Sequence, residues 1–155
     1  MLKRLLLDHM RRFRKGAMDK FALSIKALEH GWAELTLMLS NCDKVYSFEN
    51  VPNDPLYDLL ESAMKINCKI DSTISFHNCS QIECLGIKNI ENNLCCIEAD
   101  GIHTVLSKKR FSKAVLRMFD SYIFDFSCDE YCNRWNAFPS KELEKLRELY
   151  CSLVI

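Results

Sequence analysis

The stretch NDPLYDLLESAMK, residues 53–65, predicts an amphipathic helix with a sharply defined start. Asp54 precedes a proline, where helical dihedrals are disfavoured, and its carboxylate can accept hydrogen bonds from the first free amides of a helix. Pro55 suits the first helical position because its missing N–H would have no partner there. The apolar residues follow the spacing of one helical face: Leu56, Leu59, Leu60, Ala63 and Met64. We therefore expect a helix over about 55–66 with this face laid on a sheet.

Alternating apolar residues before this helix predict three antiparallel strands. Within residues 21–25 and 33–39, every second side chain is apolar, so the apolar side chains of each strand share one face. Glu29-His30-Gly31 between them is typical of a turn. A third strand is expected over 45–48. These segments predict a meander with one buried face.

Further strand patterns follow the helix, at residues 74–76, 82–84, 95–99 and 102–106. Asp100-Gly101 between the last two is a strong signal for a two-residue hairpin turn, because both positions favour a positive φ. Together with the first three, these make seven candidate strand segments, and we expect about five to six of them to form an antiparallel sheet, a meander.

Three helices are expected to close the chain and to pack against this sheet, over about 113–125, 128–135 and 141–153. Ser112 is the predicted N-cap of the first, and Ser127 has capping-box spacing for the second. Runs of strands and helices without strict alternation predict an α+β fold. We expect residues 18–155 to form a single α+β domain.

The first seventeen residues differ from the rest of the chain. Apolar residues recur there at helical spacing among lysines and arginines, which predicts a basic amphipathic helical extension over residues 1–17. Such a helix can lie on an anionic membrane surface, or it can be a packed or dispensable extension. Residues 1–20 hold seven basic and two acidic groups, a net charge of +5, which leaves the remaining 135 residues, with 14 basic and 19 acidic groups, at −5.

The negative charge of the main body disfavours nucleic-acid binding, which needs clustered basic groups to neutralise phosphates. It favours a cationic protein partner, because complementary fields speed encounter. No stretch approaches the length of apolar residues that spans a membrane, and no signal peptide is evident. The nine cysteines are odd in number and irregularly spaced, with Cys95 and Cys96 adjacent, which is typical of free thiols in a reducing compartment. We therefore expect a cytoplasmic protein.

The sequence contains no familiar motif for catalysis, metal binding or phosphate binding. Cys128 and Cys132 are one helical turn apart, and His77, Cys79 and Cys84 lie near a predicted turn, but neither set has the paired spacing of a zinc site. The other histidines near turns, including His103, are expected to be solvated. The four glycines stand far apart, so no phosphate-binding loop is indicated. We predict no catalytic residues, no metal ligands and no cofactor.

One surface is a candidate for binding a partner. Acidic groups are interleaved with large aromatic residues across the predicted helix 113–125 and the turn after it. Aromatic side chains anchor protein interfaces, and charges steer the approach of a partner. The predicted partner-binding residues are Asp120, Asp125, Asp129, Glu130 and Tyr131. The alternative is an ordinary solvated face whose aromatic residues point into the core.

Three motifs suggest a relationship. Gly31-Trp32 opens the second strand, NDPLYDLL follows the third at residues 53–60, and Glu130-Tyr131 precedes a Phe-Pro junction and a final leucine helix. In these motifs, over roughly residues 18–153, the chain resembles a group of small bacterial proteins. The group comprises uncharacterised domains and immunity-type proteins from polymorphic-toxin and contact-dependent inhibition loci. The resemblance implies that the protein binds and neutralises a cognate toxin, but no functional residue carries over by motif.

The leading hypothesis is a non-enzymatic protein-binding module, an immunity protein that neutralises a cognate bacterial toxin. The alternative is a small subunit or assembly factor of a larger complex, with the basic N-terminal helix as its contact. An unrecognised enzyme or a zinc protein is the least favoured hypothesis. The sequence does not select an oligomeric state.

Overall fold

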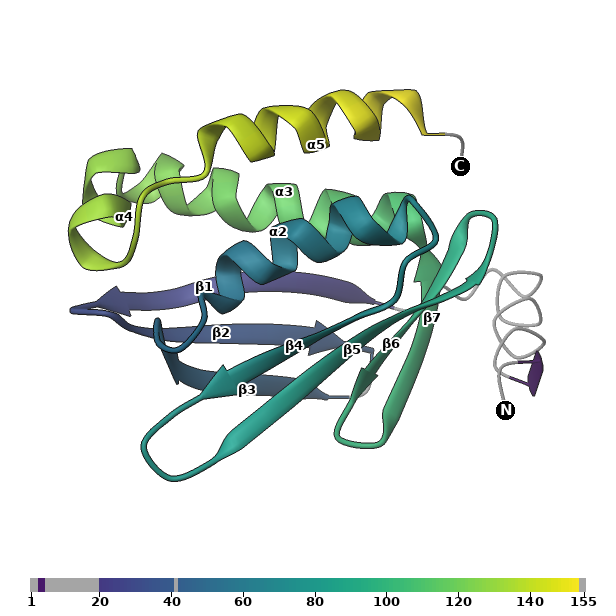
Figure 1. Ribbon diagram of the computed structural model, residues 1–155, viewed down its shortest axis with the longest axis horizontal. Helices are drawn as coiled ribbons and strands as arrows, with labels where there is room; N and C mark the ends of the chain where they lie inside the picture. The colour runs from purple at the N-terminus through teal and green to yellow at the C-terminus, as the bar shows by residue number, and fades with distance from the viewer. Residues whose placement is uncertain (1–2, 5–19, 41, 154–155) are drawn as a thin grey trace.

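The computed structural model describes residues 3–4, 20–40 and 42–153 and shows an α+β fold (Figure 1). The predicted fold class, the inserted helix and the three C-terminal helices are confirmed. The predicted extension over residues 1–17 lies outside the described residues, apart from Lys3 and Arg4. The elements, in chain order, are β1 (Phe21–Glu29), β2 (Trp32–Leu39), β3 (Asp43–Glu49), α2 (Pro55–Ile66), β4 (Ser72–His77), β5 (Ile82–Glu91), β6 (Leu94–Ala99), β7 (Ile102–Ser107), α3 (Lys108–Asp125), α4 (Cys128–Arg134) and α5 (Ser140–Ser152).

The strands form two antiparallel sheets, where the sequence predicted one of five to six strands. One sheet has the order β1-β2-β3 and the other β4-β5-β6-β7. No ladder joins β3 to β4 in the described chain; the two strands meet through side chains instead, with the rings of Tyr46 and Phe76 stacked at 4.2 Å. The α2 helix lies between β3 and β4 in the chain, and β4 begins a second ladder instead of extending the first.

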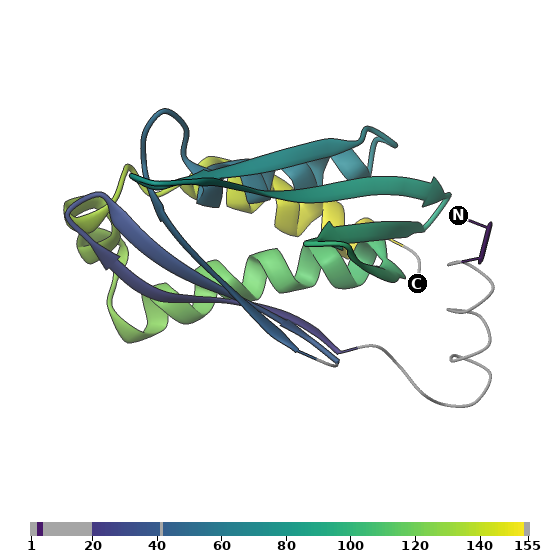
Figure 2. The same cartoon turned by 90° about the horizontal axis from the view of Figure 1, so that it is seen from below.

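The helices lie on one side of the strands (Figure 1), and the view in Figure 2 has the strands in front of them. The α2, α3 and α5 helices bury their apolar faces in one continuous core shared with both sheets. The start of α2 is as predicted: the Asp54 carboxylate accepts hydrogen bonds from the amides of Leu56 and Tyr57 at 3.1 and 3.2 Å.

Local signals placed the turns correctly. His30 and Gly31 have φ values of 50° and 79°, and Asp100 and Gly101 have 48° and 76°, which is the left-handed geometry of tight hairpins. The α3 helix, however, begins five residues earlier than predicted, because β7 leads straight into it. Its N-cap is Ser107, whose Oγ accepts a hydrogen bond from the Arg110 amide at 3.0 Å.

Ser112, the predicted cap, is instead buried inside α3, where its hydroxyl donates to the Lys108 carbonyl at 2.8 Å. The predicted limits of α4 and α5 agree with the structure to within one residue. Across the described part of the chain, no helix is both long enough and apolar enough to cross a membrane.

Candidate functional site

The predicted acidic residues lie where α3 ends and α4 begins. Asp120 pairs with Arg147 of α5, and Glu130 pairs with Arg134 one turn further along α4 at 2.9 Å. Asp125 and Asp129 are exposed and make no ion pair with any residue that the structure describes. This corner, where α3 meets α4, therefore presents two exposed carboxylates without an ion-pair partner among the described residues.

Tyr131 does not belong to this surface. Its side chain was predicted to contact a partner, but it is completely buried and offers no exposed surface in this structure. Its ring packs edge-on against Tyr122 at 5.7 Å and against Phe138 at 5.1 Å. Burial also raises the pKa of its hydroxyl well above the usual range. The phase of a seven-residue helix is hard to assign from sequence, and here the aromatic ring faces the core.

A second aromatic residue fixes the end of α4 to the rest of the molecule. Trp135 is buried, and its ring nitrogen donates to the Asp54 carboxylate at 2.9 Å, while Asn136 donates to the other carboxylate oxygen at 2.8 Å. The same carboxylate caps α2. The corner is therefore held rigidly on the start of α2.

Two phenylalanines beside the unpaired carboxylates were not predicted as site residues. Phe124 is 90% exposed and Phe126 is 50% exposed. Phe126 stacks on Tyr122 at 4.9 Å, with the Arg134 guanidinium 5.8 Å from its ring, whereas Phe124 has no ring contact among the described residues. The signal was present in the sequence, because Phe124 falls outside the apolar stripe of its helix. We call Phe124, Asp125, Phe126 and Asp129 the corner patch.

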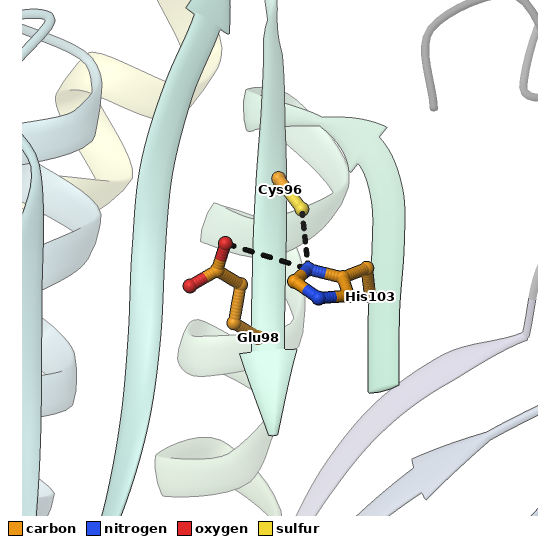
Figure 3. Close-up of side chains that lie close together, drawn as sticks. All are labelled: Cys96, Glu98 and His103. Atoms are coloured by element: carbon orange, nitrogen blue, oxygen red, sulfur yellow. Dashed lines mark hydrogen bonds and ion pairs between the residues drawn. The ribbon is translucent and has the colours of Figure 1, made fainter. Parts of the chain in front are cut away.

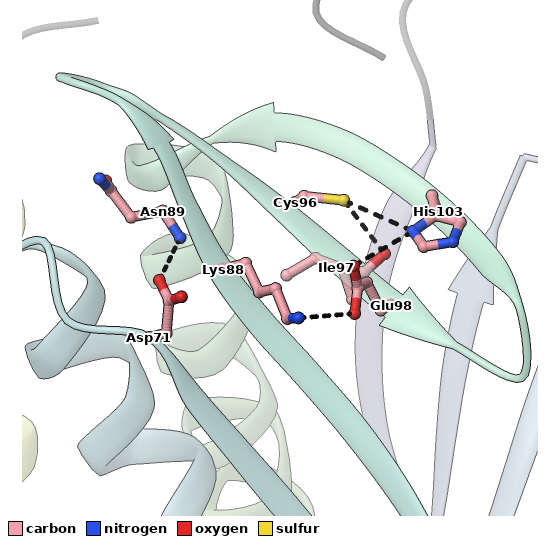
Figure 4. Close-up of polar contacts among 7 residues, drawn as sticks. All are labelled: Asp71, Lys88, Asn89, Cys96, Ile97, Glu98 and His103. Atoms are coloured by element: carbon pink, nitrogen blue, oxygen red, sulfur yellow. Dashed lines mark hydrogen bonds and ion pairs between the residues drawn. The ribbon is translucent and has the colours of Figure 1, made fainter. Parts of the chain in front are cut away.

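A different kind of site lies on the outer face of the four-stranded sheet (Figure 3). Cys96 and Glu98 are two residues apart on β6, so their side chains leave the same face, and His103 of β7 pairs directly with Glu98. The His103 Nδ1 atom lies 3.4 Å from the Glu98 Oε1 atom and 4.0 Å from the Cys96 sulfur. Lys88 of β5 approaches the other carboxylate oxygen of Glu98 at 3.5 Å (Figure 4).

Within the part of the chain that the structure describes, this is the one group of three or more His, Cys, Asp or Glu ligand atoms that all lie within 4.8 Å of one another. The sets considered from the sequence, around His77 and at Cys128 and Cys132, do not form such a group. His103 is partly buried and paired, not solvated as expected.

The sequence contained the signal for this cluster. A two-residue turn at Asp100-Gly101 fixes the register of the hairpin and places His103 opposite Glu98, with Cys96 on the same face.

The cluster lacks the arrangement of a nucleophile–base–acid relay. In such a relay, the imidazole uses one nitrogen for the nucleophile and the other for the orienting carboxylate. Here Cys96 and Glu98 both approach the same atom, Nδ1 of His103. Burial, reinforced by the nearby Glu98 charge, raises the pKa of the Cys96 thiol to about 11, which is the opposite of what an activated thiolate requires.

In comparisons with protein-family models, curated proteins and solved structures, none matches the chain. Function is therefore inferred from the chain's own residues.

Proposed function

We propose that this protein is a non-enzymatic protein-binding module that uses the corner patch to bind and neutralise a cationic bacterial toxin domain. The observation that carries the proposal is Phe124, a phenyl group that is 90% exposed at the end of a long helix. Burying a phenylalanine removes enough apolar surface from water to contribute about 1.5–3 kcal/mol. That is the scale of a single interface hot spot.

The charge of the patch supports a cationic partner. Asp125 is adjacent to Phe124, and Asp129 follows within one turn of α4; neither has a compensating base among the described residues. Residues 21–155 carry a net charge of −5 in total. Such a field speeds association with a basic surface and disfavours an acidic one.

The rigidity of the corner supports a role in recognition. The aromatic cluster around Tyr131 and the bonds from Trp135 and Asn136 to Asp54 hold the segment before and after α4 in place. Ser127, which joins α3 to α4, has a φ of 124°, a backbone conformation that costs energy for any residue other than glycine. A preordered patch loses little entropy on binding, so more of its contact energy appears as affinity.

The test uses the product of the neighbouring gene as the partner, because immunity-type proteins bind a toxin from the same locus. We expect the two proteins to form a tight 1:1 complex in calorimetry, and co-expression of this chain to restore growth to cells that produce the toxin domain. Phe124→Ala should weaken binding at least ~10-fold, on the scale of an interface hot spot.

Matched controls come from exposed residues elsewhere. Ile82→Ala removes a 63% exposed apolar side chain from β5, and Glu144→Lys makes on α5 the same charge reversal as Asp125→Lys in the patch. Both controls should leave affinity unchanged. The proposal is wrong if the neighbouring gene product does not bind, or if the control substitutions weaken the complex as much as those in the patch.

A further inference from the structure

We propose that Cys96, Glu98 and His103 bind one Zn²⁺ ion on the outer face of the four-stranded sheet, with the fourth coordination position open to water. The three side chains come from the two strands of one hairpin, β6 and β7, whose register is set by the Asp100-Gly101 turn. They supply one sulfur, one carboxylate oxygen and one imidazole nitrogen, all of which are zinc ligands.

The distances fit one ion. Around a tetrahedral Zn²⁺, bonds of about 2.1 Å place a nitrogen and an oxygen ligand about 3.4 Å apart, and a Zn–S bond of about 2.3 Å places sulfur about 3.6 Å from nitrogen. The Nδ1 atom of His103 lies 3.4 Å from Oε1 of Glu98 and 4.0 Å from Sγ of Cys96. The sulfur has to approach the nitrogen by about 0.4 Å, and all three ligand atoms lie within 4.8 Å of one another.

The cluster differs from an ordinary ion pair because Cys96 and Glu98 both approach the Nδ1 atom of His103. A cross-strand pair of Glu98 and His103 would be complete without a third group. The Cys96 thiol nevertheless lies beside the same nitrogen, and its side chain is shielded from solvent while Glu98 and His103 are 23% and 25% exposed. An ion can therefore enter through the two partly exposed ligands and reach a sulfur protected from water.

Neighbouring residues hold the carboxylate in position for this role. Lys88 binds Oε2 of Glu98 at 3.5 Å, which leaves Oε1 directed toward His103 (Figure 4). Gly86 of β5 pairs with Glu98, and a Cβ atom added there would lie 3.4 Å from Oε2. A methyl group at position 86 would therefore touch the carboxylate at van der Waals distance. Outer contacts of this kind fix the orientation of a ligand and tune metal affinity.

Coordination exchanges one bond for another without any redox step. The Cys96 S–H bond breaks, its electron pair forms the bond to Zn²⁺, and the proton passes to the buffer. His103 coordinates through the Nδ1 lone pair, so Nδ1 carries no proton in the complex. Binding to a neutral His103 therefore releases one proton per ion, the one from Cys96, and binding to an imidazolium releases a second; in both cases the coordinated ion links β6 to β7.

Titration of the full reduced chain with Co²⁺, an absorbing substitute for Zn²⁺, tests the site. We expect visible d–d absorption of tetrahedral Co²⁺ and a near-ultraviolet thiolate-to-cobalt band, both saturating at one equivalent and both abolished by added Zn²⁺. Cys96→Ser should lose the charge-transfer band, and Glu98→Gln or His103→Gln should weaken binding at least ~10-fold. Cys84→Ser is the matched control, because it changes another cysteine of the same sheet, on β5.

Circular dichroism of each variant, before and after heating, establishes that it is folded. His103→Gln alters a partly exposed side chain and keeps the test decisive even if Cys96→Ser does not fold. Failure of Co²⁺ to bind at one equivalent would overturn the proposal. Full absorption in folded Cys96→Ser would also overturn it, because the ion would then be held by one of the other eight cysteines. Neither result bears on the corner patch, which lies at the end of α3.

Discussion

The corner patch and the cluster on the outer sheet face arrange polar groups in opposite ways. At the corner, Phe124, Asp125 and Asp129 are each exposed to solvent and have no ring or ion-pair contact with one another, next to a buried aromatic cluster. On the sheet, Glu98 and His103 converge with Cys96 on one point. Side chains that diverge from a rigid base suit the surface of another protein, whereas side chains that converge suit a single small ligand.

The corner contains one fully buried aromatic residue, Tyr131, and one almost fully exposed, Phe124. Measurements of the free energy of unfolding test this difference. Tyr131→Ala should lower the free energy of unfolding by about 3–5 kcal/mol, because it empties a fully buried site among Phe119, Tyr122 and Phe138. Phe124→Ala should change it by no more than about 0.5 kcal/mol. Urea denaturation measures both, and equal losses would show that Phe124 packs in the core.

Substitution of Asp54, which holds the corner on the start of α2, should give the next largest loss of stability. Asp54→Ala removes the cap of α2 and the acceptor for Trp135 and Asn136, and we expect a loss of about 3 kcal/mol. Asp54→Asn keeps one acceptor oxygen and should lose clearly less. If Asp54→Ala unfolds at the same urea concentration as the unaltered chain, the corner is not held through this carboxylate.

A substitution beside the sheet cluster should change the affinity for Co²⁺ but hardly change the free energy of unfolding. Gly86→Ala places a methyl group against the Glu98 carboxylate, so we expect Co²⁺ to bind several-fold more weakly while the free energy of unfolding changes by less than about 1 kcal/mol. The Co²⁺ titration and urea denaturation are compared on the same preparation. Unchanged affinity would show that the orientation of Glu98 does not depend on this contact.

A small loss of stability is expected at the ion pairs that link the two sheets. Lys44 of β3 lies 2.6 Å from carboxylate oxygens of both Glu83 and Asp100, and these contacts raise the pKa of its ammonium group. Lys44→Met should cost about 1 kcal/mol at low ionic strength and less in high salt, because partly exposed ion pairs are screened. A loss that is independent of salt would indicate that the lysine stem, not its charge, is responsible.

Local signals in the sequence predicted much of this fold. The cap at Asp54 and the turns at His30-Gly31 and Asp100-Gly101 depend on a few adjacent residues, so they were visible in the sequence. The division into two sheets was not, because it depends on contacts between distant side chains such as Tyr46 and Phe76.

The two sites also differ in how far the sequence alone predicts them. The acidic character of the corner was evident from composition, but the inward direction of Tyr131 depends on the angle at which a short helix packs. The sheet cluster is predictable from the sequence, because the Asp100-Gly101 turn dictates which residues face each other across the hairpin. Spacing along the chain does not reveal the cluster, because His103 lies opposite Glu98 on the neighbouring strand.

The most direct test of the recognition account is the rate at which this protein associates with the neighbouring gene product at low and high ionic strength. We predict that association slows as salt increases, that Asp125→Lys combined with Asp129→Lys abolishes most of this dependence, and that Phe124→Ala mainly speeds dissociation. An association rate that is insensitive to both salt and these charge reversals, with unchanged dissociation of Phe124→Ala, would contradict the account.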